Sequence, residues 1–298
     1  MRGFMRLFIR SGCGFLITAC LAFSQAAAQA DARAASTPAP DESPGPPAAE
    51  APRPGTWIIN GSEHFCSIGR STQDEPPITF SVRVVPGTGS AELLLVSPDW
   101  QSVPLDDGEE VQILLEPGGA SFTHAPRAGR MRNRQPIVAF LTLPNGFVDA
   151  FAAGNSLRIV RGGETKIQFS YRQADRAVAA MQECARYTLE QWGVDQAAWA
   201  TLSQRPSMIK PWLTSNDYPI TSTELQQGFD GGVTVAMTID ATGSITRCRV
   251  VSASGHRGFD RAACGGARGR GFFRPALDSA GQPVAADIVQ RIRFQVQF

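Results

Sequence analysis

The sequence predicts an α+β protein with two folded domains. The first is an antiparallel β domain closed by a helix, and the second is a small domain in which two short helices pack on a three-stranded antiparallel sheet. Three observations support this: short alternating runs over residues 57–171, a helical period over 174–192, and the order strand, strand, helix, strand after residue 232. A chain of 298 residues is long enough for both domains and their tails.

The N-terminus predicts a cleaved signal peptide over residues 1–30. Three arginines precede the apolar run 15–23, and small residues follow up to Ala30. The apolar run has about nine residues, roughly half of what a helix needs to cross a bilayer, so we expect no transmembrane anchor. An alternative is a lipoprotein signal that leaves Cys20 acylated. Residues 31–55, which are rich in proline and alanine, follow as a linker that reaches about 75 Å if fully extended.

The first folded domain is expected over residues 56–193. Residues 78–84 alternate between apolar and polar side chains, which is typical of a half-buried strand. Turn residues, including Asn145-Gly146, separate further short apolar runs, which lie at residues 93–96, 111–115, 137–143, 157–160 and 167–171. Over residues 174–192 the apolar positions recur three or four apart, which indicates one helix that closes the domain near Gly193.

Four cysteines remain after the signal peptide, and export to an oxidising compartment favours disulfides. Four cysteines allow three pairings. We prefer Cys66 with Cys184 and Cys248 with Cys264, because this pairing keeps each bond within one predicted domain. The second bond closes a short loop, which is worth about 3 kcal/mol in the chain-entropy model.

Residues 194–213 predict a connector with a short helix, and the second domain follows over 214–298. A short helix near 222–227 is expected first. Strict alternation over 233–239 predicts a strand, and Gly243 suits the loop that returns the chain along residues 245–251. A small apolar stripe beginning at Phe259 predicts a helix, and the end of the chain alternates again as a last strand.

This order of elements resembles the C-terminal domain of the TonB energy-transducer family over residues 206–298. The resemblance rests on an ordered set of short motifs rather than on any single one; its residues include Tyr218, Pro219, Gly243, Ser254, Gly255, Asp260, Phe273, Pro275 and Gly281. The early tryptophan and cysteine and the late helix of residues 56–193 faintly resemble periplasmic domains of the invasion-associated locus B type. No site residue is carried over from that second resemblance.

The TonB resemblance implies a periplasmic, non-enzymatic module that binds an extended segment of an outer-membrane receptor or other envelope protein. Such binding adds a strand to an exposed sheet edge. We expect the last strand to provide this edge, with the partner-binding residues Ile288, Gln290, Arg291, Ile292, Arg293, Phe294, Gln295 and Val296. The alternative is a structural or self-associating periplasmic protein in which the N-terminal β domain carries the function, and a homodimer through the same strand would fit it. Because the linker is short and a folded domain stands where more spacer is expected, we expect no energy transduction.

The tight corner at residues 271–284 precedes the last strand. Pro275 fixes its own φ and disfavours helix at Arg274, and Gly281 suits the turn that follows. Glycines over residues 265–271 predict that the preceding helix ends near Cys264.

Other chemistries have weaker support in the sequence. Ser254, His256 and Asp260 lie close together, but no nucleophile-elbow motif surrounds the serine, and we interpret them as caps and turns. His64 and Cys66 lack a second ligand pair at metal spacing. No phosphate-binding glycine loop is present, so we expect no cofactor. A net charge of +1 argues against nucleic acid as a partner, including at the glycine- and arginine-rich residues 265–271.

Overall fold

The structure is a computed structural model that describes residues 55–98, 100, 104–106, 108–131, 133–144, 146–213, 230–267 and 273–295. Residues 51–298 form one compact unit. The predicted signal peptide and nearly all of the predicted linker lie outside the described residues. Within the described ranges, no helix has the length and apolar character that a membrane span requires.

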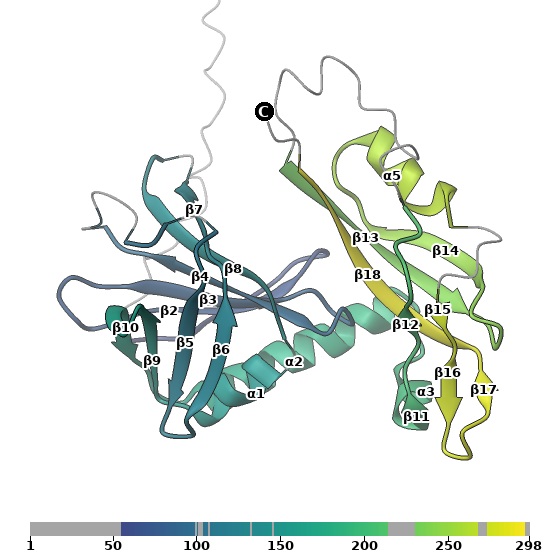
Figure 1. Cartoon of the computed structure of the whole chain (residues 1–298), viewed down its shortest axis with the longest axis horizontal. Helices are drawn as coiled ribbons and strands as arrows, with labels where there is room; N and C mark the ends of the chain where they lie inside the picture. Colours follow the sequence, from purple (N-terminus) through teal and green to yellow (C-terminus); the bar gives the residue numbers. More distant parts are fainter. Residues whose placement is uncertain are drawn as a thin grey trace, which may run out of the picture. The chain divides into compact units, whose positions relative to one another are not determined.

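Residues 56–193, called the N-terminal part below, form two antiparallel sheets. The first has the strand order β1-β2-β3-β4-β8-β7 and the second β10-β9-β5-β6 (Figure 1). The strands are β1 (Ile58–Gly61), β2 (Cys66–Ser71), β3 (Thr79–Val84), β4 (Ser90–Val96), β5 (Val111–Glu116), β6 (Ala120–His124), β7 (Arg127–Arg130), β8 (Pro136–Pro144), β9 (Ser156–Arg161) and β10 (Glu164–Ser170). An antiparallel β architecture for these residues agrees with the prediction.

The strands carry the expected alternation of burial. In β5 the side chains of Val111, Ile113 and Leu115 are buried while those between them are exposed or half-buried. Both sheets contribute to one hydrophobic core, in which Trp57 and Tyr171 belong to an aromatic cluster around Phe80 and Phe151. Burying one face of each sheet against the other provides the main stabilisation of this part.

Two helices complete the N-terminal part. Helix α2 (Ala174–Gln191) confirms the predicted helix, and its buried residues include Val178, Met181 and Leu189. Helix α1 (Gly146–Ala153) is a correction, because Asn145-Gly146 was expected to form a turn between strands. Phe147 and Phe151 on α1 are fully buried in the core. Packing of these aromatic side chains therefore explains a short helix that the local sequence does not predict.

The connector contains helix α3 (Gln196–Ala200) and the short strands β11 (Leu202–Gln204) and β12 (Ser207–Met208). These strands pair with the predicted corner: β12 pairs with β15 (Phe273–Arg274), and β11 pairs with β16 (Ala276–Asp278). β16 also pairs with β17 (Pro283–Val284). The corner before the last strand is therefore held by the connector, which sequence reasoning did not predict.

Residues 214–298, called the C-terminal part below, contain a three-stranded antiparallel sheet in the order β14-β13-β18 (Figure 1). Its strands are β13 (Asp230–Ile239), β14 (Ile245–Ser252) and β18 (Ala286–Gln295). Helix α5 (Arg257–Gly265) buries Phe259 and Ala263 against the sheet and ends where the glycines begin, as predicted. The other expected helix, near residues 222–227, lies outside the described residues.

The two faces of this sheet pack against different parts of the chain. Val233, Val235 and Met237 face the core that contains Phe259 of α5. On the other face, Ala236 and Val289 are buried in a cluster, called the junction cluster below, with Val85, Leu189, Trp192 and Val194. The junction cluster therefore joins residues of the N-terminal part to the C-terminal sheet. The domain boundaries at residues 193 and 214 remain a prediction.

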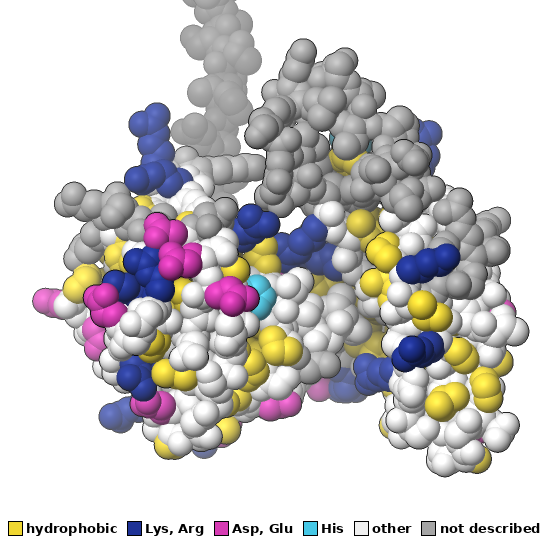
Figure 2. Space-filling view, in the orientation of Figure 1, with side chains coloured by type: hydrophobic (Ala, Val, Ile, Leu, Met, Phe, Trp, Pro, Cys, Tyr) yellow, Lys and Arg dark blue, Asp and Glu magenta, His cyan; other side chains and the backbone are white. Residues whose placement is uncertain are grey.

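The face of the molecule in Figure 2 carries basic, acidic and apolar side chains interspersed. This mixture is consistent with the near-neutral net charge of the chain.

Candidate functional site

β18 lies at one edge of the C-terminal sheet. It pairs with β13 from Ala286↔Ile239 to Gln295↔Asp230, and within the described part of the chain no strand pairs with its other side. The edge of a sheet presents backbone N–H and C=O groups that a further strand can pair with. The fold therefore places the predicted last strand where strand addition is possible.

The side chains predicted to bind a partner are divided between the two faces of the sheet. Ile288 is 7% exposed and belongs to the core of the C-terminal part, and Ile292 packs against that core. Phe294 and Gln295 belong to β18, but their side chains, like the whole of Val296, lie outside the described residues. Because the side chains of Ile288 and Ile292 pack in the core, the backbone of β18 is a better candidate for partner contact than these side chains.

Arg293 makes an ion pair with Glu92 of β4, and Glu92 also pairs with Arg83 of β3. The Glu92 residue is only 3% exposed, so two arginine side chains, 24% and 32% exposed, surround one buried carboxylate. Burial lowers the pKa of the Arg83 guanidinium below its ordinary value. Burial, followed by the nearby charge of Arg83, lowers the pKa of Arg293. Desolvation therefore lowers both pKa values, and only that of Arg293 is also lowered by a neighbouring cation.

A cavity of about 270 Å³ lies beside these residues. It is called the edge cavity below, and its lining consists of Val85, Thr88, Ser90, Glu92, Thr142, Gln290, Arg291 and Arg293. Thr142 has a φ of 62° in a bulge of β8, where two residues oppose Glu92. A β-branched residue with positive φ is a genuine outlier, and such strained positions concentrate at functional sites.

The start of β18 is closed by the connector. The indole Nε1 of Trp199 donates a hydrogen bond to the backbone oxygen of Asp287 at 2.7 Å. The Asp287 carboxylate accepts a hydrogen bond from Thr238 Oγ1 at 2.6 Å. These contacts fix the first residues of the strand, so the part of the edge beside the edge cavity begins after Asp287.

Ser254, His256 and Asp260 form the start of α5. The Asp260 carboxylate accepts hydrogen bonds from the backbone N–H and the hydroxyl of Ser254, both at 2.7 Å. The Ser254 hydroxyl oxygen accepts from the backbone N–H of His256 at 3.1 Å. These contacts support the interpretation as a turn and helix start.

The family-motif residues of the hairpin and corner contact one another. Gly243 has a φ of 83°, and a Cβ there would lie 2.0 Å from the backbone oxygen of Phe273. Only glycine permits this approach of the hairpin to the corner. Gly281, with a φ of 75°, closes the turn after Asp278 through a backbone hydrogen bond of 3.0 Å. Tyr218 and Pro219 lie outside the described residues.

Both preferred cysteine pairs lie at disulfide distance, with Cα separations of 6.0 Å for Cys66–Cys184 and 5.6 Å for Cys248–Cys264. The first bond ties α2 to β2.

His64, two residues before Cys66, places its Nδ1 2.5 Å from the Ser252 hydroxyl of β14. No group of three or more potential metal ligands occurs among the residues that the structure describes.

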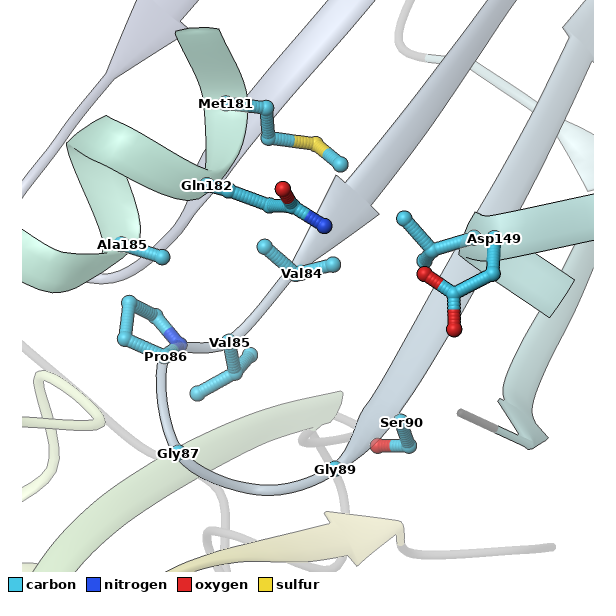
Figure 3. A pocket seen from close by; sticks show the side chains of 11 residues that line it. Val84, Val85, Pro86, Gly87, Gly89, Ser90, Asp149, Met181, Gln182 and Ala185 are labelled. Carbon is cyan, nitrogen blue, oxygen red and sulfur yellow. The ribbon is translucent and has the colours of Figure 1, made fainter. Parts of the chain in front are cut away.

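Two of the other hollows in the described part of the chain border helix α2. The pocket in Figure 3, of about 280 Å³, is lined by Met181 and Gln182 of α2, Asp149 of α1 and the loop that follows Val84. A larger groove of about 590 Å³ runs past Tyr187 of α2. Neither carries a charge arrangement comparable with that of the edge cavity.

Sequence reasoning missed Glu92, Trp199 and Thr142. A signal for Glu92 was available, since the residue interrupts the apolar run Ala91-Glu92-Leu93, and an acidic residue within a buried strand requires a cationic partner. Trp199 and Thr142 act through contacts between distant segments and leave no local pattern.

Comparison with known families identifies the C-terminal part. Residues 215–296 match the family of the Gram-negative bacterial TonB protein C-terminal domain, which confirms the resemblance predicted from the motifs. Domains of this family are periplasmic, non-enzymatic protein-interaction modules that contact outer-membrane proteins. The comparison with curated proteins gave no match. The resemblance of residues 56–193 to locus B domains remains a prediction.

Proposed function

We propose that this chain is an exported, non-enzymatic envelope protein whose C-terminal part binds an extended segment of an outer-membrane or periplasmic partner. Binding occurs by strand addition along β18. The observation that supports this best is the position of β18 at the edge of the sheet in a TonB C-terminal domain. Main-chain hydrogen bonds to the edge provide affinity, and pockets for alternate side chains provide preference.

The contacts of β18 restrict where a partner strand pairs. The indole of Trp199 already donates a hydrogen bond to the backbone oxygen of Asp287, so the added strand pairs with the residues after Asp287. Because Ile288 and Ile292 pack in the core, an added strand contacts them only through the backbone. The interaction therefore depends on backbone pairing more than on the apolar side chains of β18.

We further propose that the chain binds without transducing energy. A transducer of this family needs a spacer that crosses the periplasm. The predicted linker reaches about 75 Å only when fully extended. The N-terminal part, with its own core, occupies the position in the sequence where further spacer is expected.

Alternately N-methylated peptides test strand addition, with the whole exported chain as the protein. Short extended peptides from outer-membrane receptors are labelled with a fluorophore, and binding is followed by anisotropy. An added strand directs every second N–H toward β18, so methylation of one alternate set of amides should abolish binding. Methylation of the other set should leave it nearly unchanged. Equal effects of the two sets, or no binding by any peptide, would contradict the proposal.

A second candidate function is self-association through the N-terminal part. The groove of about 590 Å³ beside α2 is lined by Tyr187, which is 61% exposed, together with Trp192 and Val251. Large exposed apolar side chains around a groove are typical of protein contacts. Sedimentation equilibrium of the chain and of Tyr187→Ser tests this. A monomer at every concentration would exclude self-association.

A further inference from the structure

The edge cavity lies at the outer side of β18 rather than over one face of the sheet. Neighbouring residues of a strand point to opposite faces. Gln290, opposite Val235, belongs to the face that carries α5, whereas Arg291 and Arg293 belong to the face of the junction cluster. The cavity is lined by residues of both sets, so it extends around the edge of the strand.

The second wall of the edge cavity comes from the N-terminal part. Thr88, Ser90 and Glu92 belong to β4 and the loop before it, and Thr142 comes from β8. The Glu92–Arg293 ion pair holds this wall against β18, and the lack of a side chain at Gly87 allows the two to approach closely. A Cβ at Gly87 would lie 2.8 Å from the Val289 side chain and 2.9 Å from that of Leu189. The wall is therefore closely fitted to β18.

A strand added to β18 would lie about 4.8 Å from it in the plane of the sheet, with every second side chain on the side of the N-terminal part. We infer that the N-terminal part forms the second wall of the partner site, and that the edge cavity receives a carboxylate side chain of the added strand. This inference rests on the proposed strand addition, and it assigns a binding role to Ser90 and Arg293.

The charges around the cavity favour an anionic side chain. Arg83 and Arg293 share the single carboxylate of Glu92, so these three partly desolvated side chains together carry one more positive than negative charge. An entering carboxylate would balance this excess, and charge-assisted hydrogen bonds from a guanidinium are stronger than neutral ones.

The threonine hydroxyl groups of the N-terminal wall already donate hydrogen bonds to backbone oxygens. Thr88 Oγ1 donates to the Val85 backbone oxygen at 2.9 Å, and Thr142 Oγ1 donates to the Leu141 oxygen at 2.5 Å. Because the hydrogens of Thr88 and Thr142 are already donated, the donors for a carboxylate are Arg293 on the β18 side and the hydroxyl of Ser90, which lies 3.3 Å from Thr88 Oγ1. Ser90, half-buried at the start of β4, lines the cavity from the opposite wall.

Paired peptides that differ only in one carboxylate test the inference on the whole exported chain. Extended peptides of alternating valine and threonine carry aspartate or its amide isostere asparagine, moved through successive positions. At the position that faces the edge cavity, the aspartate peptide should bind about tenfold more tightly, the difference between a charged and a neutral hydrogen bond. Ser90→Asp should remove this preference, because it places a second carboxylate in the cavity. The matched control is Ser121→Asp on β6, an exposed serine outside the cavity lining.

The outcomes separate the two proposals. A preference that is lost in Ser90→Asp and kept in Ser121→Asp supports a partner site with a wall from the N-terminal part. If aspartate and asparagine peptides bind equally at every position, the carboxylate inference is wrong and strand addition stands. A preference that Ser90→Asp leaves unchanged overturns the role of the N-terminal wall. If neither peptide binds to the folded chain, strand addition fails and the inference fails with it.

Discussion

Glu92 and Arg293 form an ion pair between β4 and the last strand, across a sequence separation of 201 residues. The carboxylate also binds Arg83, and it is buried in the N-terminal part. Removing one partner of a buried ion pair leaves the other charges without compensation, which is costly even where the intact pair contributes little. The pair therefore adds to the junction cluster in holding β18 against the N-terminal part.

We expect Glu92→Gln to lower the free energy of unfolding by about 2 kcal/mol, because two arginines lose their shared carboxylate in a partly buried site. Urea unfolding monitored by circular dichroism measures this. Glu164→Gln is the control, since Glu164 pairs with Lys166 and its side chain is 72% exposed. An exposed pair of that kind contributes little, because solvent screens its two charges. Equal losses in the two variants would contradict the role assigned to Glu92.

Gly87→Ala should destabilise the chain by about 3 kcal/mol. Its φ is 81°, and the new Cβ would overlap Val289 and Leu189 in the junction cluster, so a backbone cost and an overpacking cost add. Gly119→Ala is the matched control, because its φ is 67° and nothing lies within 4 Å of the new atom. Only the backbone cost of about 1 kcal/mol applies there. Chemical denaturation followed by tryptophan fluorescence compares them, and similar midpoints would show that the junction tolerates a side chain at Gly87.

The Cys248–Cys264 bond closes a loop with a sequence separation of 16 residues, between β14 and α5. Replacing both cysteines by serine should cost about 3 kcal/mol in the chain-entropy model. Removing Cys66–Cys184, with a separation of 118, should cost about 5 kcal/mol in the same model. Urea midpoints of the two double variants test the order. A larger loss from the shorter loop would mean that local packing, rather than loop closure, dominates.

Tyr171 should make the chain less stable at alkaline pH. Burial raises the pKa of its phenol above the ordinary value of about 10. Above pH 10 the unfolded chain therefore loses this proton while the folded chain keeps it. Stability is fully present below that pH and decreases as pH rises toward the folded pKa.

Tyr171→Phe tests this pH dependence. It removes a hydrogen bond of 3.3 Å to the Phe151 backbone oxygen and costs about 1 kcal/mol at neutral pH. The variant should lose less stability than the parent between pH 9 and about pH 11. Tyr187→Phe, at an exposed position, should lose as much as the parent. A parallel decline in all three proteins would exclude Tyr171 as the group responsible.

The sequence alone was sufficient for elements with a strong local period. The alternation in β13, the glycine of its hairpin and the apolar stripe of α2 each fix a local conformation, because period and turn chemistry act over a few residues. The motifs of residues 218–284 likewise indicated the TonB C-terminal domain, which the family comparison confirmed. Helix α1 escaped prediction, because its stability depends on burial of Phe147 and Phe151.

Only the tertiary structure brought together the residues of the candidate site. Glu92, Thr142 and Arg293 come from three strands far apart in the sequence, and no local pattern specifies which strands become neighbours. The sequence determined that the last segment is a strand and that Glu92 interrupts an apolar run. Long-range packing in the junction cluster decided which side chains of β18 are buried and which face the edge cavity, because burial of apolar area depends on the partner surface and not on the strand itself.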